Sequence, residues 1–128
     1  MSQSANQNEP ASIVRRAGEC ETITAPWGAL TWFANARQGN CREMTVGRCV
    51  IKPGCANPLH SHPNCTEVLV VLAGRIAHRI EGGAEIEMGP GDVITLPTGL
   101  PHNARNLGDS DAVLLVTFSS ADRQTRGE

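Results

Sequence analysis

Apolar residues fall in short runs along this chain, and the runs have the length of β-strands. The clearest is Thr66–Leu72, which is dense in β-branched residues and apolar on both faces after Glu67. A strand of this kind is typically buried on both faces, as in a sandwich or in a barrel covered by another sheet or subunit. Further strands are expected at Gly28–Phe33, Met44–Ile51, Arg75–Glu81, Ala84–Met88, Val93–Leu96 and Ala112–Phe118.

Glycine and proline separate these runs. Gly82-Gly83 predicts a hairpin between two of the strands, and Pro53-Gly54 and Pro90-Gly91 predict sharp turns. With 13 glycines and 8 prolines in 128 residues, a helix of three turns has few places to form. The pattern predicts a single all-β domain, a barrel or jelly roll, over residues 13–118. We expect a disordered tail at 1–12 and a polar tail at 119–128.

Charge and aromatic content exclude several kinds of partner. Eleven basic and 13 acidic residues give a net charge of −2, and the chain has two Trp, two Phe and no Tyr. A nucleic-acid-binding protein needs a basic face and usually stacking aromatics, so nucleic acid is not expected as a partner. No apolar run approaches the roughly 20 residues of a membrane-spanning helix. Without tyrosine, a mechanism that needs a tyrosine acid or base is excluded.

Cysteine usage favours a reducing compartment. The count is odd, and no pair has the Cys-x-x-Cys spacing of a redox motif or zinc knuckle. The polar start, MSQSANQNEPAS, lacks the basic and apolar stretches of a secretory signal. We therefore expect a cytoplasmic protein with reduced thiols at Cys20, Cys41, Cys49, Cys55 and Cys65.

The spacing of the histidines indicates a metal-binding site. His60 and His62 are separated by one residue, so in an extended segment both imidazoles point to the same face, whereas in a helix they would diverge. Glu67 opens an otherwise apolar strand, and a buried carboxylate needs a partner such as a divalent cation. His102 follows a Pro97-Thr98-Gly99 turn. Three imidazoles and one carboxylate suit Fe, Mn, Ni, Co or Zn rather than Mg or Ca.

These residues stand in two motifs that resemble those of the cupin superfamily, over residues 54–106. The first motif reads Gly54, five residues, His60-Ser61-His62, four residues, Glu67, six residues and Gly74. The second reads Gly91, five residues, Pro97-Thr98-Gly99, two residues, His102, three residues and Asn106. Both match the family pattern at every fixed position.

The resemblance implies a small, single-domain double-stranded β-helix that binds one metal ion. It implies His60, His62, Glu67 and His102 as the ligands, which would leave two adjacent open positions in a six-coordinate site. Metal-free cupins exist, so a polar pocket without metal is the alternative. Small cupins generally form dimers, and the apolar row Val68, Val70 and Leu72 opposite Glu67 also calls for a covering surface; we therefore expect a homodimer.

Fold alone does not select a reaction. The primary expectation is a metal-dependent enzyme acting on a small oxygen-rich substrate that chelates the metal, of the redox-neutral lyase, isomerase or cyclase type. Glu67 is the expected catalytic residue, because it is the carboxylate placed to move a proton. The alternatives are a dioxygenase using Fe or Mn, and a non-catalytic module that binds a small molecule or metal.

Substrate contacts are expected from His78, Arg48 and Trp32, although each has a structural alternative. His78 lies on an alternating strand and could be a buried barrel histidine. Arg48 could be a solvated outer residue or an anion clamp, and Trp32 could pack in the core. Cys55 and Cys65 bracket the histidine pair. A thiol near an oxygen-activating metal would be an oxidation hazard, which favours redox-neutral chemistry.

Overall fold

The structure is a computed structural model that describes residues 13–127, so the tail predicted at 1–12 lies outside the described residues. Strands dominate this region, and the helical parts are single turns such as Ala17–Glu19. None of these helices is long and apolar enough to cross a bilayer. The strands are β1 Glu21–Ala25, β2 Gly28–Ala34, β3 Thr45–Ile51, β4 Glu67–Ala73, β5 Ile76–Ile80, β6 Glu85–Met88, β7 Val93–Leu96, β8 His102–Asn106 and β9 Ala112–Phe118.

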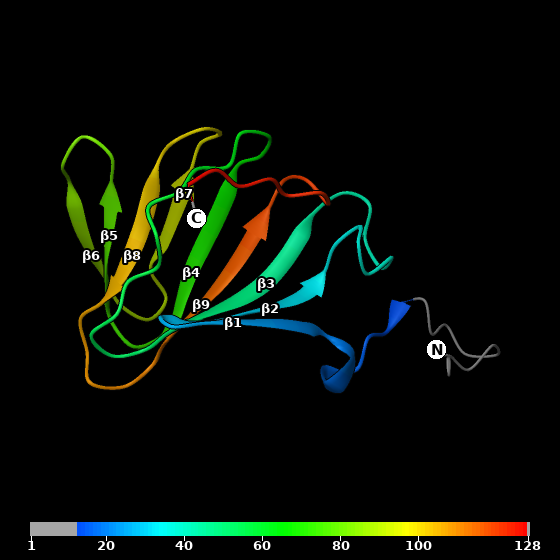
Figure 1. Cartoon of the computed structure of the whole chain (residues 1–128), viewed down its shortest axis with the longest axis horizontal. Coiled ribbons are helices and arrows are strands. Elements are labelled where there is room, and N and C mark those ends of the chain that lie inside the picture. Colours follow the sequence, from blue (N-terminus) through cyan, green and yellow to red (C-terminus); the bar gives the residue numbers. More distant parts are fainter. Residues whose placement is uncertain (1–12, 128) are drawn as a thin grey trace.

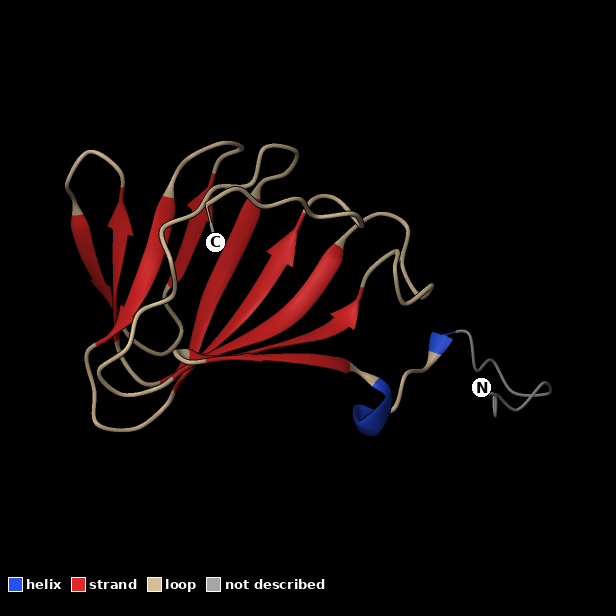
Figure 2. Ribbon diagram, in the orientation of Figure 1, coloured by secondary structure: helices blue, strands red, loops and turns tan. Residues whose placement is uncertain are grey.

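The strands form two antiparallel sheets that together make a jelly-roll barrel. The larger sheet has the order β1-β2-β3-β9-β4-β7, and the smaller has the order β6-β5-β8 (Figure 1). The strands fan out from a shared narrow end and loops join them at both ends, with almost no helix (Figure 2). The predicted all-β barrel is therefore confirmed.

Alternation of buried and accessible positions directs one face of each long strand inward. In β9 every second residue from Ala112 to Phe118 is buried, and β3 follows the same alternation. Because β3 and β9 are paired neighbours in the larger sheet, their buried rows lie side by side and form a continuous part of the core. Its most deeply buried apolar members include Ile51, Val71, Ile76, Ala112 and Leu114.

All seven predicted strands are present, and two further strands, β1 and β8, were not predicted. The structure reproduces the expected bounds of β7 and β9, and Gly82-Gly83 turns the β5–β6 hairpin with φ values of 107° and 114°. β1 is largely exposed, so its sequence carries no apolar row. In β8, two of the three inward positions are polar, and a hydrophobic pattern therefore cannot reveal this strand.

The outer face of β4 differs from the expectation of burial on both sides. The inward residues Glu67, Leu69 and Val71 are buried, but Val68 is 37% exposed and Leu72 is 52% exposed. The physical reason is that the six-stranded sheet has no second layer on its outer side within one chain. The apolar outer row is therefore open to solvent in the single chain.

Gly47 makes room for the indole ring of Trp32. The two residues face each other across β2 and β3, and a Cβ atom on Gly47 would lie 2.5 Å from Trp32 Cε3 and 2.8 Å from the Thr31 carbonyl oxygen. We expect Gly47→Ala to lower the free energy of unfolding by about 1–3 kcal/mol, because an overpacked site must shift. Urea unfolding measures the difference. Gly18→Ala is the control, since its Cβ would contact nothing within 4 Å; equal losses in both variants would contradict the argument.

The residues after β9 fold back along the barrel. Ser61 and Arg126 exchange two backbone hydrogen bonds of 2.9 Å, and Ser119 N donates to Thr66 O. This segment, drawn red in Figure 1, runs back from the end of β9 across β4. Composition predicted only a polar tail here, whereas residues 119–127 pack beside the histidine pair.

Candidate metal centre

An isolated bridge brings the histidine pair to β8. His60 and His102 exchange backbone hydrogen bonds of 3.0 and 2.8 Å, so the segment around His60 is extended. Residues i and i+2 of an extended segment share a face, as expected. The ring centroid of His60 lies 4.9 Å from that of His62 and 4.4 Å from that of His102.

Glu67 begins β4 and points inward at the same place. Its side chain is buried, and the residue is 4% exposed. Oε1 lies 3.0 Å from His102 Nε2 and 3.2 Å from His62 Nε2. The four donor atoms of His60, His62, Glu67 and His102 all lie within 4.8 Å of one another. The structure thus brings together all four residues predicted to bind metal.

Backbone carbonyls fix the orientation of all three imidazoles. Nδ1 of His60 lies 2.7 Å from Pro58 O, Nδ1 of His62 lies 3.0 Å from Gln124 O, and Nδ1 of His102 lies 2.8 Å from Leu100 O. A carbonyl oxygen only accepts, so each Nδ1 carries the proton and each Nε2 presents its lone pair.

This arrangement fits a cation. In the neutral tautomer, the Nε2 lone pairs of His62 and His102 face a carboxylate oxygen at 3.2 and 3.0 Å, and these acceptors repel unless a positive charge lies among them. Where Nε2 of His102 and His62 donates to Glu67 instead, burial still raises the pKa of Glu67, but these contacts outweigh burial and lower that pKa to about 2. Burial lowers the pKa of His60 to about 4, against the opposing effect of its hydrogen bond to Pro58 O. The donor set suits a divalent transition metal.

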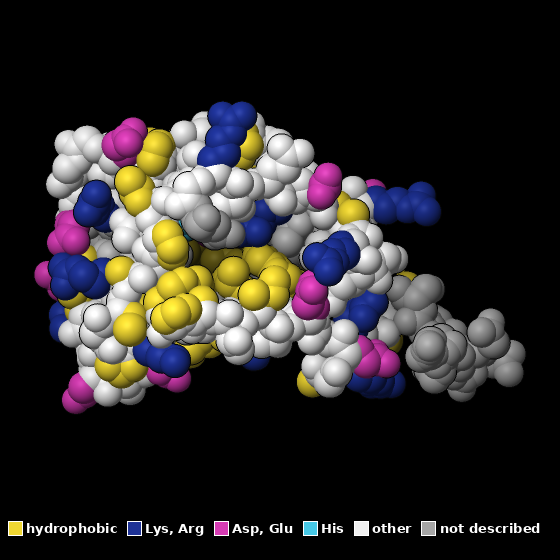
Figure 3. Space-filling model, in the orientation of Figure 1, with side chains coloured by type: hydrophobic (Ala, Val, Ile, Leu, Met, Phe, Trp, Pro, Cys, Tyr) yellow, Lys and Arg dark blue, Asp and Glu magenta, His cyan; other side chains and the backbone are white. Residues whose placement is uncertain are grey.

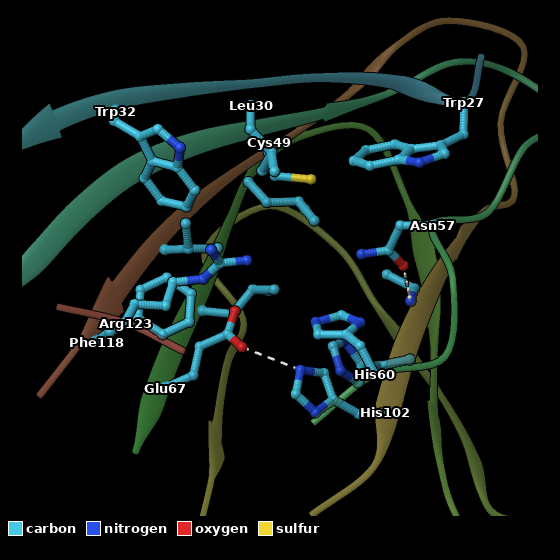
Figure 4. Close-up of a pocket in the computed structure, with 15 residues that line it drawn as sticks. Trp27, Leu30, Trp32, Cys49, Asn57, His60, Glu67, His102, Phe118 and Arg123 are labelled. Carbon is cyan, nitrogen blue, oxygen red and sulfur yellow. Dashed lines mark hydrogen bonds and ion pairs between the residues drawn. The ribbon is translucent and has the colours of Figure 1, made fainter. Parts of the chain in front are cut away.

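The cluster opens into a small cavity inside the barrel, of about 30 Å³. In Figure 4, Glu67 lies between His60 and His102 on one side and Arg123 on the other, with Trp27 and Trp32 above. Figure 3 shows hydrophobic side chains gathered around a hollow on this face. The apolar lining residues are Trp27, Leu30, Trp32, Leu69, Ala104, Leu114, Val116 and Phe118.

The three predicted substrate contacts lie in different places. His78 is 1% exposed, lines the cavity and stacks on His102 with 5.5 Å between ring centroids. Neither of its ring nitrogens has a hydrogen-bond partner. Burial, together with a smaller effect of the neighbouring His102, lowers the pKa of His78 to about 4. Trp32 is buried and also lines the cavity. Arg48 is exposed, lies over the Phe33 ring and is not among the lining residues.

Among the lining residues with a nitrogen, oxygen or sulfur atom in the side chain, four were not predicted as site residues: Trp27, Cys49, Asn57 and Arg123. The inward direction of Cys49 follows from the alternation around Arg48, once the outward direction of Arg48 is known. Neither Cys55 nor Cys65 lines the cavity; Cys65 is buried in the core and Cys55 packs against it. No disulfide joins the five cysteines, all of which the structure describes.

Comparison with known proteins identifies relatives of the chain. The Cupin_2 family model, described as a cupin domain, matches residues 47–118, which contain the whole metal-binding cluster. Germin-like protein 3-8 of Oryza sativa subsp. japonica is 35% identical over 85 residues, covering 63% of this chain and 38% of the relative. Germin-like protein 4-1 of the same organism is 34% identical over 110 residues, covering 77% and 43%. The chain thus spans about two-fifths of the length of these relatives.

A solved structure agrees with the observed barrel. Oxalate decarboxylase from Bacillus subtilis superposes with a TM-score of 0.76 at 22% identity, over 84% of this chain and 29% of that chain. At this identity the likeness concerns the fold.

Proposed function

The chain belongs to the cupin family, and from this premise we propose that it is a metal-dependent enzyme acting on a small oxygen-rich substrate. The observation that carries the proposal is the buried cluster of three Nε2 atoms and one carboxylate, whose imidazoles are already oriented by backbone carbonyls. A closed structural site would have no adjoining space, whereas this cluster faces a cavity.

His60, His62, Glu67 and His102 would hold the ion. A bound divalent metal would act as a Lewis acid on the substrate oxygens. The apolar walls keep water from the reacting groups, which strengthens electrostatic interactions inside the cavity. Glu67 uses Oε1 for both imidazole contacts, so we assign Oε2 as the atom that accepts a proton from the substrate.

We favour redox-neutral chemistry, of the lyase, isomerase or cyclase type. The supporting observation is Cys49, whose buried thiol lines the same cavity. A thiol beside an oxygen-activating metal would be exposed to oxidation. The alternative is a dioxygenase with Fe or Mn. Oxygen-electrode measurements during substrate loss distinguish the two, because oxygen uptake in proportion to turnover would contradict the redox-neutral proposal.

His78 is assigned as a hydrogen-bond partner of the substrate. A buried imidazole with two unpartnered nitrogens is destabilising by about 1–3 kcal/mol per group, so a ligand or ordered water at this position would offset the loss. We expect His78→Phe to weaken substrate binding by roughly tenfold while metal content is unchanged. His78→Gln keeps a donor and an acceptor and should retain more of the affinity. Equal substrate affinity in the wild type and His78→Phe would contradict this role of His78.

The function is tested by metal analysis followed by a metabolite screen. Protein purified without added metal or an affinity tag is analysed for elements, then screened against small hydroxy, keto and carboxylic acids. Turnover that disappears in His102→Ala, with its fold retained by circular dichroism, would support an enzyme. Stoichiometric metal without turnover of any candidate would favour the non-catalytic binding module.

We also propose a homodimer in a cytoplasmic setting. Val68, Leu72 and Val93, which is 56% exposed, lie on the outer side of β4 and β7, and β7 is an edge strand. An exposed apolar row along a sheet edge favours association with a second sheet. Sedimentation equilibrium at micromolar concentration tests the dimer, and a monomer there would contradict it.

A further inference from the structure

Only two of the residues that line the inner cavity carry a formal charge, Glu67 and Arg123. A divalent metal beside the single carboxylate of Glu67 would keep one unit of positive charge at the cluster, in a largely apolar cavity. Uncompensated charge in such surroundings is unfavourable, and a bound anion relieves it. The charge of the lining thus favours an anionic ligand over a neutral one.

Aromatic rings hold the Arg123 guanidinium at the cavity wall. Its Cζ atom lies 4.8 Å from the Trp32 ring centroid and 5.1 Å from the Phe118 ring centroid. In Figure 4, Arg123 lies beside these two rings and across the cavity from His60 and His102. A guanidinium carries its N–H donors in its own plane, and this planar fork matches the two oxygens of a carboxylate.

The segment after β9 fixes this position through one amide side chain. Asn64 Nδ2 donates to Asp122 O at 2.8 Å, and Asn64 Oδ1 accepts from Gln124 N at 3.0 Å. The backbone on both sides of Arg123 is therefore held by Asn64. The same segment supplies the Gln124 carbonyl that orients His62, so it links the arginine to the metal cluster.

Arg123 and Trp32 also line an outer pocket of about 240 Å³. Because both side chains belong to the outer pocket and to the inner cavity, they form the partition between them. Of the charged residues that line the outer pocket, Glu21, Arg37, Asp122 and Arg123, only Arg123 also lines the inner cavity.

We propose that Arg123 determines substrate specificity by binding a carboxylate of a short-chain acid, and that Asn64 is its positioning residue. The inner cavity, about 30 Å³ where one water needs roughly 10–15 Å³, suits an acid of about two or three carbons. This inference rests on the proposed function, since the other oxygens of the acid would face the metal cluster.

The test is calorimetric titration of the metal-loaded full chain with glycolate and with glycolamide, its neutral counterpart. We expect the wild type to prefer glycolate. Arg123→Met keeps an apolar side chain against the two rings and should weaken glycolate binding by roughly tenfold to a hundredfold, with little effect on glycolamide. Arg123→Lys keeps the charge without the planar fork, so its glycolate affinity should lie between those of the wild type and Arg123→Met. Arg126→Met, on the same segment but outside the cavity lining, is the matched control.

Asn64 is tested by a double-mutant cycle, which separates positioning from general stability. Asn64→Ala, compared with the wild type at matched metal content, should weaken glycolate binding several-fold but should have no further effect in the Arg123→Met background. An equal effect in both backgrounds would show that Asn64 does not act through Arg123 and would overturn its positioning role.

Elemental analysis of every variant distinguishes a failure of the role proposed for Arg123 from a failure of the proposed metal-dependent function. Glycolate binding that is absent from the metal-loaded wild type, or unchanged in Arg123→Met, overturns the assignment of Arg123 and leaves the metal enzyme standing. Arg123-dependent glycolate binding by a wild type that takes up no metal supports Arg123 and overturns the metal-dependent function. A wild type that binds neither metal nor glycolate overturns both.

Discussion

Replacing His60 and His62 together by alanine should remove the metal from the protein. Both imidazoles present Nε2 to the cluster, and their Nδ1 atoms are held by Pro58 O and Gln124 O. Loss of one group that hydrogen-bonds to a metal ligand already lowers metal affinity by about 10–100-fold, so loss of two ligands should lower it considerably more. We expect near-stoichiometric metal in the wild type and background levels in the double variant, measured by elemental analysis and chelator competition.

His78→Phe is the matched control for this experiment. It alters a buried histidine of the same cavity that stacks on His102 but is not a member of the four-residue cluster. Its metal content should therefore equal that of the wild type. Metal retained by the His60/His62 variant, or lost equally from the His78 variant, would contradict the assignment of ligands. Circular dichroism of each variant verifies that the barrel is folded.

The cluster could be predicted from the sequence because local spacing and the two cupin-like motifs agree. His60 and His62 share a face by the two-residue period, Glu67 opens a strand expected to be buried, and the resemblance to the cupin motifs implied the complete set with His102. Likewise, β9 was predicted with its bounds because its β-branched and aliphatic residues form an uninterrupted run.

What could not be predicted depends on contacts between distant parts of the chain. Arg123 follows the last strand, and its place in the cavity is set by Asn64, about sixty positions earlier. The outward direction of Arg48 and the inward direction of Cys49 depend on the register of β3, which a slip of one residue would reverse. β8 was missed because its inward residues His102 and Asn106 are polar.

Acid should destabilise the metal-free protein strongly between pH 6.5 and pH 4. Burial lowers the pKa of both His60 and His78 from 6.5 to about 4. As the pH falls through 6.5, the unfolded chain binds protons at these residues and the folded chain does not. The free energy of unfolding therefore falls with pH until the folded residues are protonated near pH 4, by about 3 kcal/mol for each histidine.

Glu67 extends this loss to lower pH. Its pKa is lowered from 4.5 to about 2 in the folded chain, so its contribution to stability is present above pH 4.5 and is lost as the pH approaches 2. Two histidines at about 3 kcal/mol each are a large part of the roughly 5–15 kcal/mol of a typical domain, so the metal-free protein should be much less stable at pH 4 than at pH 7.

Urea unfolding in the presence of a chelator, at intervals from pH 7.5 to pH 4.5, measures this dependence. His78→Gln removes one of the two buried histidines, so its free energy of unfolding should fall about half as steeply with pH as that of the wild type. Arg48→Gln, on the exposed outer face of β3, should leave the slope unchanged. A wild-type stability that is flat over this range, or an unaltered slope in His78→Gln, would show that these imidazoles are not held neutral by burial. Metal added back should raise stability near pH 7.5 and lose its effect in acid, because protons compete for the same Nε2 atoms.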